Sequence, residues 1–217
     1  MKKIILLCLV GIALALSAAP ASANNIVVNG NFSTGDFSNW TVHNCVGPCG
    51  GAPWQVRAFP NDPGTKPTDT AFAAFTGCSP STSLSSLCND PVNGAWISQS
   101  LATVASQSYT LSFLFDAGLG SGTSGTTTEL DVLWNGTLLP GGQIINAPAS
   151  TWQPYTFTGL LATGTSTALE FTGREDPTVL WLTDISVLPT PEPSSLLLVG
   201  TGLLGLMAMT WRRKRFA

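Results

Sequence analysis

The octapeptide Tyr109-Thr110-Leu111-Ser112-Phe113-Leu114-Phe115-Asp116 has the clearest periodicity in this sequence of 217 residues. Large apolar residues recur at every second position, so one face carries Tyr109, Leu111, Phe113 and Phe115. The opposite face is expected to carry Thr110, Ser112 and Asp116. A period of two over this length predicts a half-buried β-strand.

Turn-forming residues divide the rest of the region 24–188 into further short strands. Asn135-Gly136 is a strong hairpin signal, because both central positions of a type I′ turn need positive φ. No window of this region shows a convincing helical period. About ten strands with turn signals at close spacing predict an all-β sandwich. The other expected strands are 26–28, 54–58, 71–75, 95–101, 129–134, 137–139, 152–159, 165–172 and 180–188.

Both ends of the sequence carry targeting signals. Lys2-Lys3 precedes an apolar stretch at 4–16, and Ala21-Ser22-Ala23 supplies the small residues that a signal peptidase recognises. Residues 1–23 are therefore predicted to be a secretory signal peptide.

At the other end, 194–211 is an uncharged apolar run of roughly 18 residues, which predicts one transmembrane helix. A basic cluster follows it, formed by Arg212, Arg213, Lys214 and Arg215. Under the positive-inside rule this cluster stays in the cytoplasm, and the region 24–188 lies outside.

The last segment, 189–217, resembles the PEP-CTERM sorting signal of Gram-negative bacteria. It has the tripeptide Pro191, Glu192 and Pro193, then the apolar run, then the basic cluster. The two prolines hold the backbone extended at the outer membrane boundary. The resemblance implies that a membrane-embedded exosortase cleaves near the tripeptide. The released passenger domain, residues 24–188, is then delivered from the inner membrane to the cell surface or extracellular matrix. The alternative is an ordinary C-terminal anchor that no enzyme cuts.

Removing the targeting segments changes the charge pattern. Of the 9 basic residues only Arg57, Lys66 and Arg174 lie in the exported part, whereas 11 of the 12 acidic residues lie there, which gives a formal charge of 3 − 11 = −8. This balance argues against nucleic acid as a partner, since phosphate binding needs clustered Lys and Arg. An acidic surface suits a soluble extracellular protein.

Four cysteines remain after processing, an even number that suits an oxidising compartment. Three pairings are possible. The pairs Cys45 with Cys49 and Cys78 with Cys88 are favoured, because each closes a short ring within a loop rich in turn formers. Disulfides that close such short rings would hold the loops together, but they would restrain the unfolded chain only modestly. The alternative is a zinc site with His43 nearby.

Residues 29–40 space three aromatic side chains with turn formers. We expect these side chains to fill the space between the sheets at one end of the sandwich: Phe32, Phe37 and Trp40. The segment resembles the N-G-x-F-E-x-G-x-F-x-x-W opening of secreted galactose-binding-like jelly-roll domains, and 181–187 resembles their last strand.

That second resemblance implies a jelly-roll fold with a structural calcium. The candidate ligands are Asn31, Asp36 and Asp184, from the first loop and the last strand. Ser33 and Thr183 stand where those relatives usually carry acidic residues.

Signatures of catalysis are weak. The single histidine, His43, is expected in an exposed loop, and the sequence has no Gly-x-Ser-x-Gly elbow, phosphate loop or dinucleotide fingerprint. Glu129 and Asp131 share one strand face, and Glu175-Asp176 follows Arg174 in a loop. Such carboxylate pairs can hydrolyse glycosides, but only at a set separation. The sequence therefore predicts no enzyme, with a glycan hydrolase as the alternative.

Aromatic residues favour a binding role instead. Exposed indole faces stack on sugar rings, with polar groups beside them for the hydroxyls. Trp54 and Trp152 lie near loops and are the candidate ligand-binding residues, whereas Trp134 and Trp181 on strands are expected to be structural. We expect an exported, non-catalytic surface protein that binds or structures extracellular polysaccharide or biofilm matrix. A purely structural surface protein is the remaining alternative.

Overall fold

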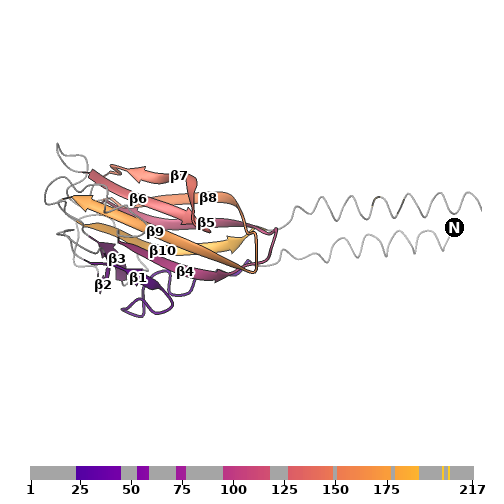
Figure 1. Ribbon diagram of the computed structural model, residues 1–217, viewed down its shortest axis with the longest axis horizontal. Coiled ribbons are helices and arrows are strands. Elements are labelled where there is room, and N and C mark those ends of the chain that lie inside the picture. The colour runs from indigo at the N-terminus through magenta and orange to yellow at the C-terminus, as the bar shows by residue number, and fades with distance from the viewer. Residues whose placement is uncertain are drawn as a thin grey trace, which may run out of the picture. The chain divides into compact units, whose positions relative to one another are not determined.

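Two five-stranded antiparallel sheets make up the fold in the part of the chain that the computed structural model describes (Figure 1). The described residues are 23–44, 53–58, 72–76, 95–117, 127–148, 151–176 and 179–190, together with Gly202 and Gly205. The strands are β1 (Thr41–His43), β2 (Gln55–Ala58), β3 (Phe72–Thr76), β4 (Trp96–Ala102), β5 (Ser108–Asp116), β6 (Thr127–Trp134), β7 (Thr137–Ile145), β8 (Gln153–Leu161), β9 (Ser166–Asp176) and β10 (Leu180–Pro189).

The strand order is β1-β4-β9-β6-β7 in the first sheet and β2-β3-β10-β5-β8 in the second. All ten strands belong to one compact unit, Asn24–Pro189. Strands that are distant in sequence, such as β4 and β9, are neighbours, so the hydrophobic face of each sheet is assembled from the whole length of this unit. The predicted all-β sandwich is confirmed.

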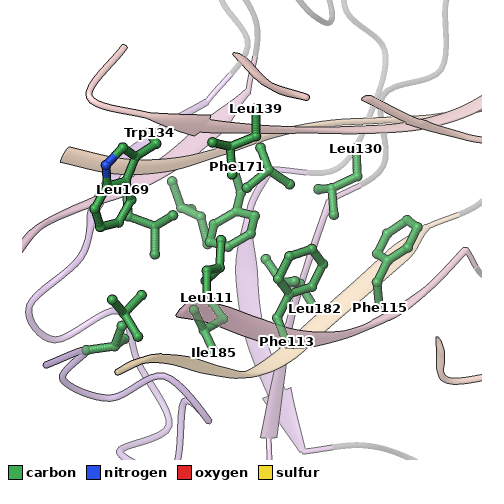
Figure 2. Close-up of a cluster of buried hydrophobic side chains, with 14 of the residues drawn as sticks. Leu111, Phe113, Phe115, Leu130, Trp134, Leu139, Leu169, Phe171, Leu182 and Ile185 are labelled. Carbon is green, nitrogen blue, oxygen red and sulfur yellow. The ribbon is translucent and has the colours of Figure 1, made fainter. Parts of the chain in front are cut away.

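The core lies between the sheets and follows from the alternation that β5 shows. Leu111, Phe113 and Phe115 point inward from the second sheet towards side chains of the first, as Figure 2 shows. The Phe113 and Phe171 rings meet edge to face with centroids 5.2 Å apart, which ties the two sheets together. Asp116 lies on the outer face of β5, as expected, opposite Trp181 of β10 in the register, but it is completely buried there.

Two local predictions have different outcomes. Asn135 and Gly136 have φ of 52° and 76°, so the predicted type of hairpin turn joins β6 and β7. By contrast, residues 26–28 were expected to form a strand and do not. This segment makes one isolated backbone bond, from Ile26 N to Val187 O at 3.0 Å, and then turns away at Asn29, whose φ is 54°.

The aromatic residues of the first loop plug the sandwich, as predicted. Phe32 is fully buried, and its ring lies 5.5 Å from Phe37 and 5.7 Å from Trp40, between centroids. Trp40 in turn reaches Phe171 in β9, with the ring centroids 6.4 Å apart. The loop is therefore part of the core and holds the start of the domain in place.

Most of the two predicted targeting segments lies outside the described residues, so the structure does not test them. Residues 1–22, which hold most of the predicted signal peptide, lie outside the described residues. Within the described residues no helix is long and apolar enough to cross a bilayer. Of the predicted span 194–211, only Gly202 and Gly205 are described, so the membrane helix stays a prediction.

Candidate functional site

Five side chains form a row across the outer face of the first sheet, one from each strand. The register places His43 of β1 beside Trp96 of β4, followed by Thr172 of β9, Asp131 of β6 and Gln143 of β7. The row points away from the core, because the flanking residues Ile97, Phe171, Val132 and Ile144 are buried between the sheets. Directly opposed side chains lie about 5 Å apart at Cβ, so the five are neighbours; Thr172 in the middle is buried, whereas the other four are half-buried or exposed. We call them the outer row.

An aromatic stack forms one end of the outer row. The rings of His43 and Trp96 are 5.2 Å apart and nearly parallel, at 12°. Both side chains are half-buried, so part of the stack is open to solvent. His43 was expected in an exposed loop, and this expectation was wrong: it lies in β1, a strand that the sequence did not reveal. Trp96 was not selected as a binding residue, although its position before buried Ile97 fixes its outward direction.

Carboxylates occupy the middle of the face. Glu129 and Asp131 leave β6 on the same side, as predicted, with buried Leu130 and Val132 on the other. Gln143 Nε2 donates a hydrogen bond of 2.7 Å to Glu129 Oε1. Glu170 of β9 flanks the outer row, opposite Leu133 in the register.

Burial changes the acidity of this face. Two effects raise the pKa of Asp131 to about 6. The larger is desolvation by burial, and the smaller is repulsion from the Glu129 carboxylate. Burial also raises the pKa of Glu170 above its usual value. Asp131 Oδ1 is buried and accepts no hydrogen bond within the part of the chain that the structure describes. The face therefore holds carboxylate acceptors beside an aromatic stack.

The two tryptophans predicted to bind ligand lie elsewhere. Trp54 is 4% exposed and Trp152 is 8% exposed. A buried ring cannot stack on a sugar, so the structure offers no exposed indole face at either position. Their binding role stays a prediction that this conformation does not favour.

A polar pocket of about 390 Å³ lies where the first loop meets the bulge in β10. It brings together Asn31 and Asp184, two of the three predicted calcium ligands. The full lining is Asn25, Val27, Asn29, Gly30, Asn31, Asp184, Ile185 and Ser186. Asp36 does not line it. Its Oδ1 accepts hydrogen bonds from Ser38 N at 2.9 Å and Thr34 Oγ1 at 2.7 Å, and hydrogen bonds from these two residues lower its pKa.

The asparagines of this pocket already serve the backbone. Asn25 Oδ1 accepts hydrogen bonds from Val27 N at 3.0 Å and Val187 N at 2.8 Å. Asn31 Oδ1 accepts one from Ser33 N at 3.2 Å, and Asn29 Nδ2 donates to the Asp36 carbonyl at 3.0 Å.

The donor set of the pocket does not fit calcium. Calcium takes about six to eight oxygen ligands and favours several carboxylates. Among the described lining residues Asp184 is the one carboxylate, and no group of three or more acidic, histidine or cysteine side chains that could hold a metal occurs in the described part of the chain. The calcium site therefore stays a prediction, and the described residues give it no support.

The remaining predicted sites fall outside the described residues. This applies to Cys45, Cys49, Cys78 and Cys88, so the disulfides and the zinc alternative stay predictions. It also applies to the sorting tripeptide and to the basic cluster.

Comparisons with known proteins agree with both parts of the sequence. Residues 189–214 match the PEP-CTERM protein-sorting motif. No curated protein sequence matches this chain significantly. Two solved structures share the fold of the domain. TmCBM61 in complex with β-1,4-galactotriose has 14% identity and a TM-score of 0.50, and the match covers 77% of this chain and 99% of that one. A candidate sugar binding protein from Bacteroides thetaiotaomicron VPI-5482 has 12% identity and a TM-score of 0.52, with coverage of 77% and 100%.

Identities this low show the fold alone, a β-sandwich of two antiparallel sheets. The motif match independently confirms the resemblance seen in the tail. The chain therefore combines a β-sandwich that has the fold of these two structures with a match to the PEP-CTERM protein-sorting motif at residues 189–214.

Proposed function

We propose that this protein is an exported surface protein that binds extracellular polysaccharide through the outer row. The observation that carries the proposal is the stack of His43 on Trp96 beside the carboxylates of β6. The two structural relatives support it, since one was solved with a galactotriose and the other is described as a candidate sugar binding protein.

The chemistry of the outer row suits a sugar. The C–H face of a pyranose packs on an aromatic ring, while its hydroxyl groups seek polar partners at the ring edge. Trp96 supplies the aromatic surface, and the half-buried side chain of Asp131 supplies a carboxylate acceptor. The row runs across all five strands of the sheet, so it offers length for a polymer rather than for a single sugar.

The sorting motif supports a route to the surface. Signal peptidase removes residues 1–23, and the apolar segment 194–211 holds the chain in the inner membrane. An exosortase then cuts near Pro191-Glu192-Pro193 and releases the domain to the cell surface or matrix. The motif match at 189–214 supports this order of events.

Glycan hydrolysis is the second candidate, and one observation favours it. Asp131, with a pKa of about 6, lies next to Glu129 on the same strand face, and glycosidases also use a pair of carboxyl groups. We favour binding without catalysis, because Gln143 already holds Glu129 by a hydrogen bond. A hydrolase would release reducing sugar from a bound polymer, and Asp131→Asn would abolish that release.

Affinity electrophoresis of the full chain in detergent tests the proposed function. The gels contain β-1,4-galactan, xylan, mannan or β-glucan, and we expect at least one to retard the protein. Trp96→Ala should lower the affinity for that polysaccharide at least about tenfold, since stacking on an aromatic ring is worth roughly 1.4 kcal/mol or more. Trp181→Ala is the matched control, because Trp181 is equally half-buried but faces outward from the second sheet. Equal loss in both variants, or none in Trp96→Ala, would remove the outer row as the site.

A further inference from the structure

The charge around the outer row is strongly one-sided. Glu129, Asp131 and Glu170 lie on the outer face of β6 and β9. Arg174 is the one cation on that face among the described residues, and the register places it directly opposite Glu129. The exported part as a whole carries three basic residues against eleven acidic ones. A polymer that approaches the outer row therefore meets a negative field.

Three carboxylates supply hydrogen-bond acceptors on this face. Ionised carboxylates only accept hydrogen bonds, whereas sugar hydroxyls can donate them. The Gln143 amide, a donor in the outer row, is already directed to Glu129 Oε1 at 2.7 Å. The half-buried carboxylates of Asp131 and Glu170 can thus accept hydrogen bonds from the hydroxyls of a neutral sugar. A uronic acid would bring a further acceptor carrying the same charge, and like charges across an interface suppress binding.

We infer that the outer row selects uncharged polysaccharides and rejects polymers built from uronic acids. This inference rests on the proposed function and adds the class of ligand. It concerns the ratio of two affinities, so it can fail while polysaccharide binding itself holds.

The same electrophoresis, at low ionic strength, measures this ratio. Polygalacturonate and alginate serve as acidic probes beside the four neutral polymers. We expect the best neutral polymer to be bound at least about tenfold more tightly than either polyuronate. Added salt should narrow the gap, because exposed charges are screened within about 10 Å at 0.1 M ionic strength. Equal or tighter binding of a polyuronate would overturn the inference. No retardation in any gel would instead overturn the proposed function, and the inference with it.

Two variants assign the selectivity to these side chains. The triple variant Glu129→Gln, Asp131→Asn and Glu170→Gln keeps the side-chain shapes and removes the negative charge, so the ratio should shrink at least about threefold. Arg174→Gln removes the cation, and the ratio should grow. Thermal melting checks that each variant is folded. A ratio that stays unchanged in both folded variants would show that selectivity does not arise at this face.

Discussion

At the scale of single residues, the outer face shows how position changes chemistry. Asp131 and Asp36 are the same residue type in two different environments. Asp36 is exposed and accepts hydrogen bonds from its own turn, so its pKa is lowered. Asp131 is half-buried beside another carboxylate, and its pKa rises to about 6. A carboxylate with so high a pKa is costly to keep ionised, which marks the β6 surface as more than a solvated face.

The Asp131 pKa makes stability depend on pH. The folded protein holds this proton up to about pH 6, whereas the unfolded chain loses it near pH 3.8, so between these values the folded state binds more protons. The free energy of unfolding therefore falls as pH rises through this window. Asp131→Asn removes the effect, and at pH 7 we expect it to stabilise the protein by about 1 kcal/mol after allowance for solvent screening.

Denaturant unfolding of both proteins between pH 4 and pH 8 measures this difference. The gain in the variant should be absent near pH 4 and complete by pH 7. Glu170 and Asp36 are present in both proteins, so their own titration cancels. A difference that is independent of pH would show that the effect of the substitution is not the removal of a titrating group.

At the scale of elements, what the sequence could predict was local. Alternation in 109–115 and the Asn135-Gly136 pair each carry their signal within a few residues, and both predictions are confirmed. Trp96 carries no such signal. It becomes part of a site only because β1 pairs with β4 and sets His43 against it, over fifty residues away in sequence. Tryptophans near loops look exposed in a sequence, yet Trp54 and Trp152 are covered by the fold.

The attachment of the first loop to β10 depends on a close backbone approach. Gly30 O accepts a hydrogen bond from Ile185 N at 3.0 Å, next to Asp184, whose φ is 53° in the β10 bulge. A Cβ added to Gly30 would overlap the Ile185 carbonyl oxygen. The glycine at this position therefore lets the loop lie directly on the strand.

Gly30→Ala should separate the first loop from β10. We expect a cost of about 3 kcal/mol, or a melting temperature lower by roughly 10 °C, because neither backbone can yield without breaking the hydrogen bond between them. Gly164→Ala is the matched control, since the nearest atom to a Cβ there is 3.8 Å away. Differential scanning calorimetry of the two variants measures the effect. Equal melting temperatures would mean that the loop can shift at no cost.

At the scale of the whole molecule, the proposed sorting and binding functions fall in two different parts of the chain. The sandwich holds the described carboxylates and aromatic rings, and the match to the sorting motif begins at residue 189, where β10 ends. A cut near residues 191–193 would thus separate the sandwich from the predicted membrane segment without removing any of its strands. This arrangement predicts that cleavage changes the location of the protein and leaves its polysaccharide binding intact.

Replacement of Pro191, Glu192 and Pro193 by alanine tests the sorting prediction in a Gram-negative host that has an exosortase. We expect the wild-type chain to appear outside the inner membrane as a shortened species, and the variant to stay at full length in the inner-membrane fraction, with cleavage reduced at least about tenfold. Immunoblots of fractionated cells, with mass spectrometry of the new C-terminus, give both readouts. Pro154→Ala, at an exposed proline in β8, is the control and should be processed normally. If the wild-type chain is never shortened, the tail is an ordinary anchor; if the variant is still cut, the tripeptide is not what the enzyme recognises.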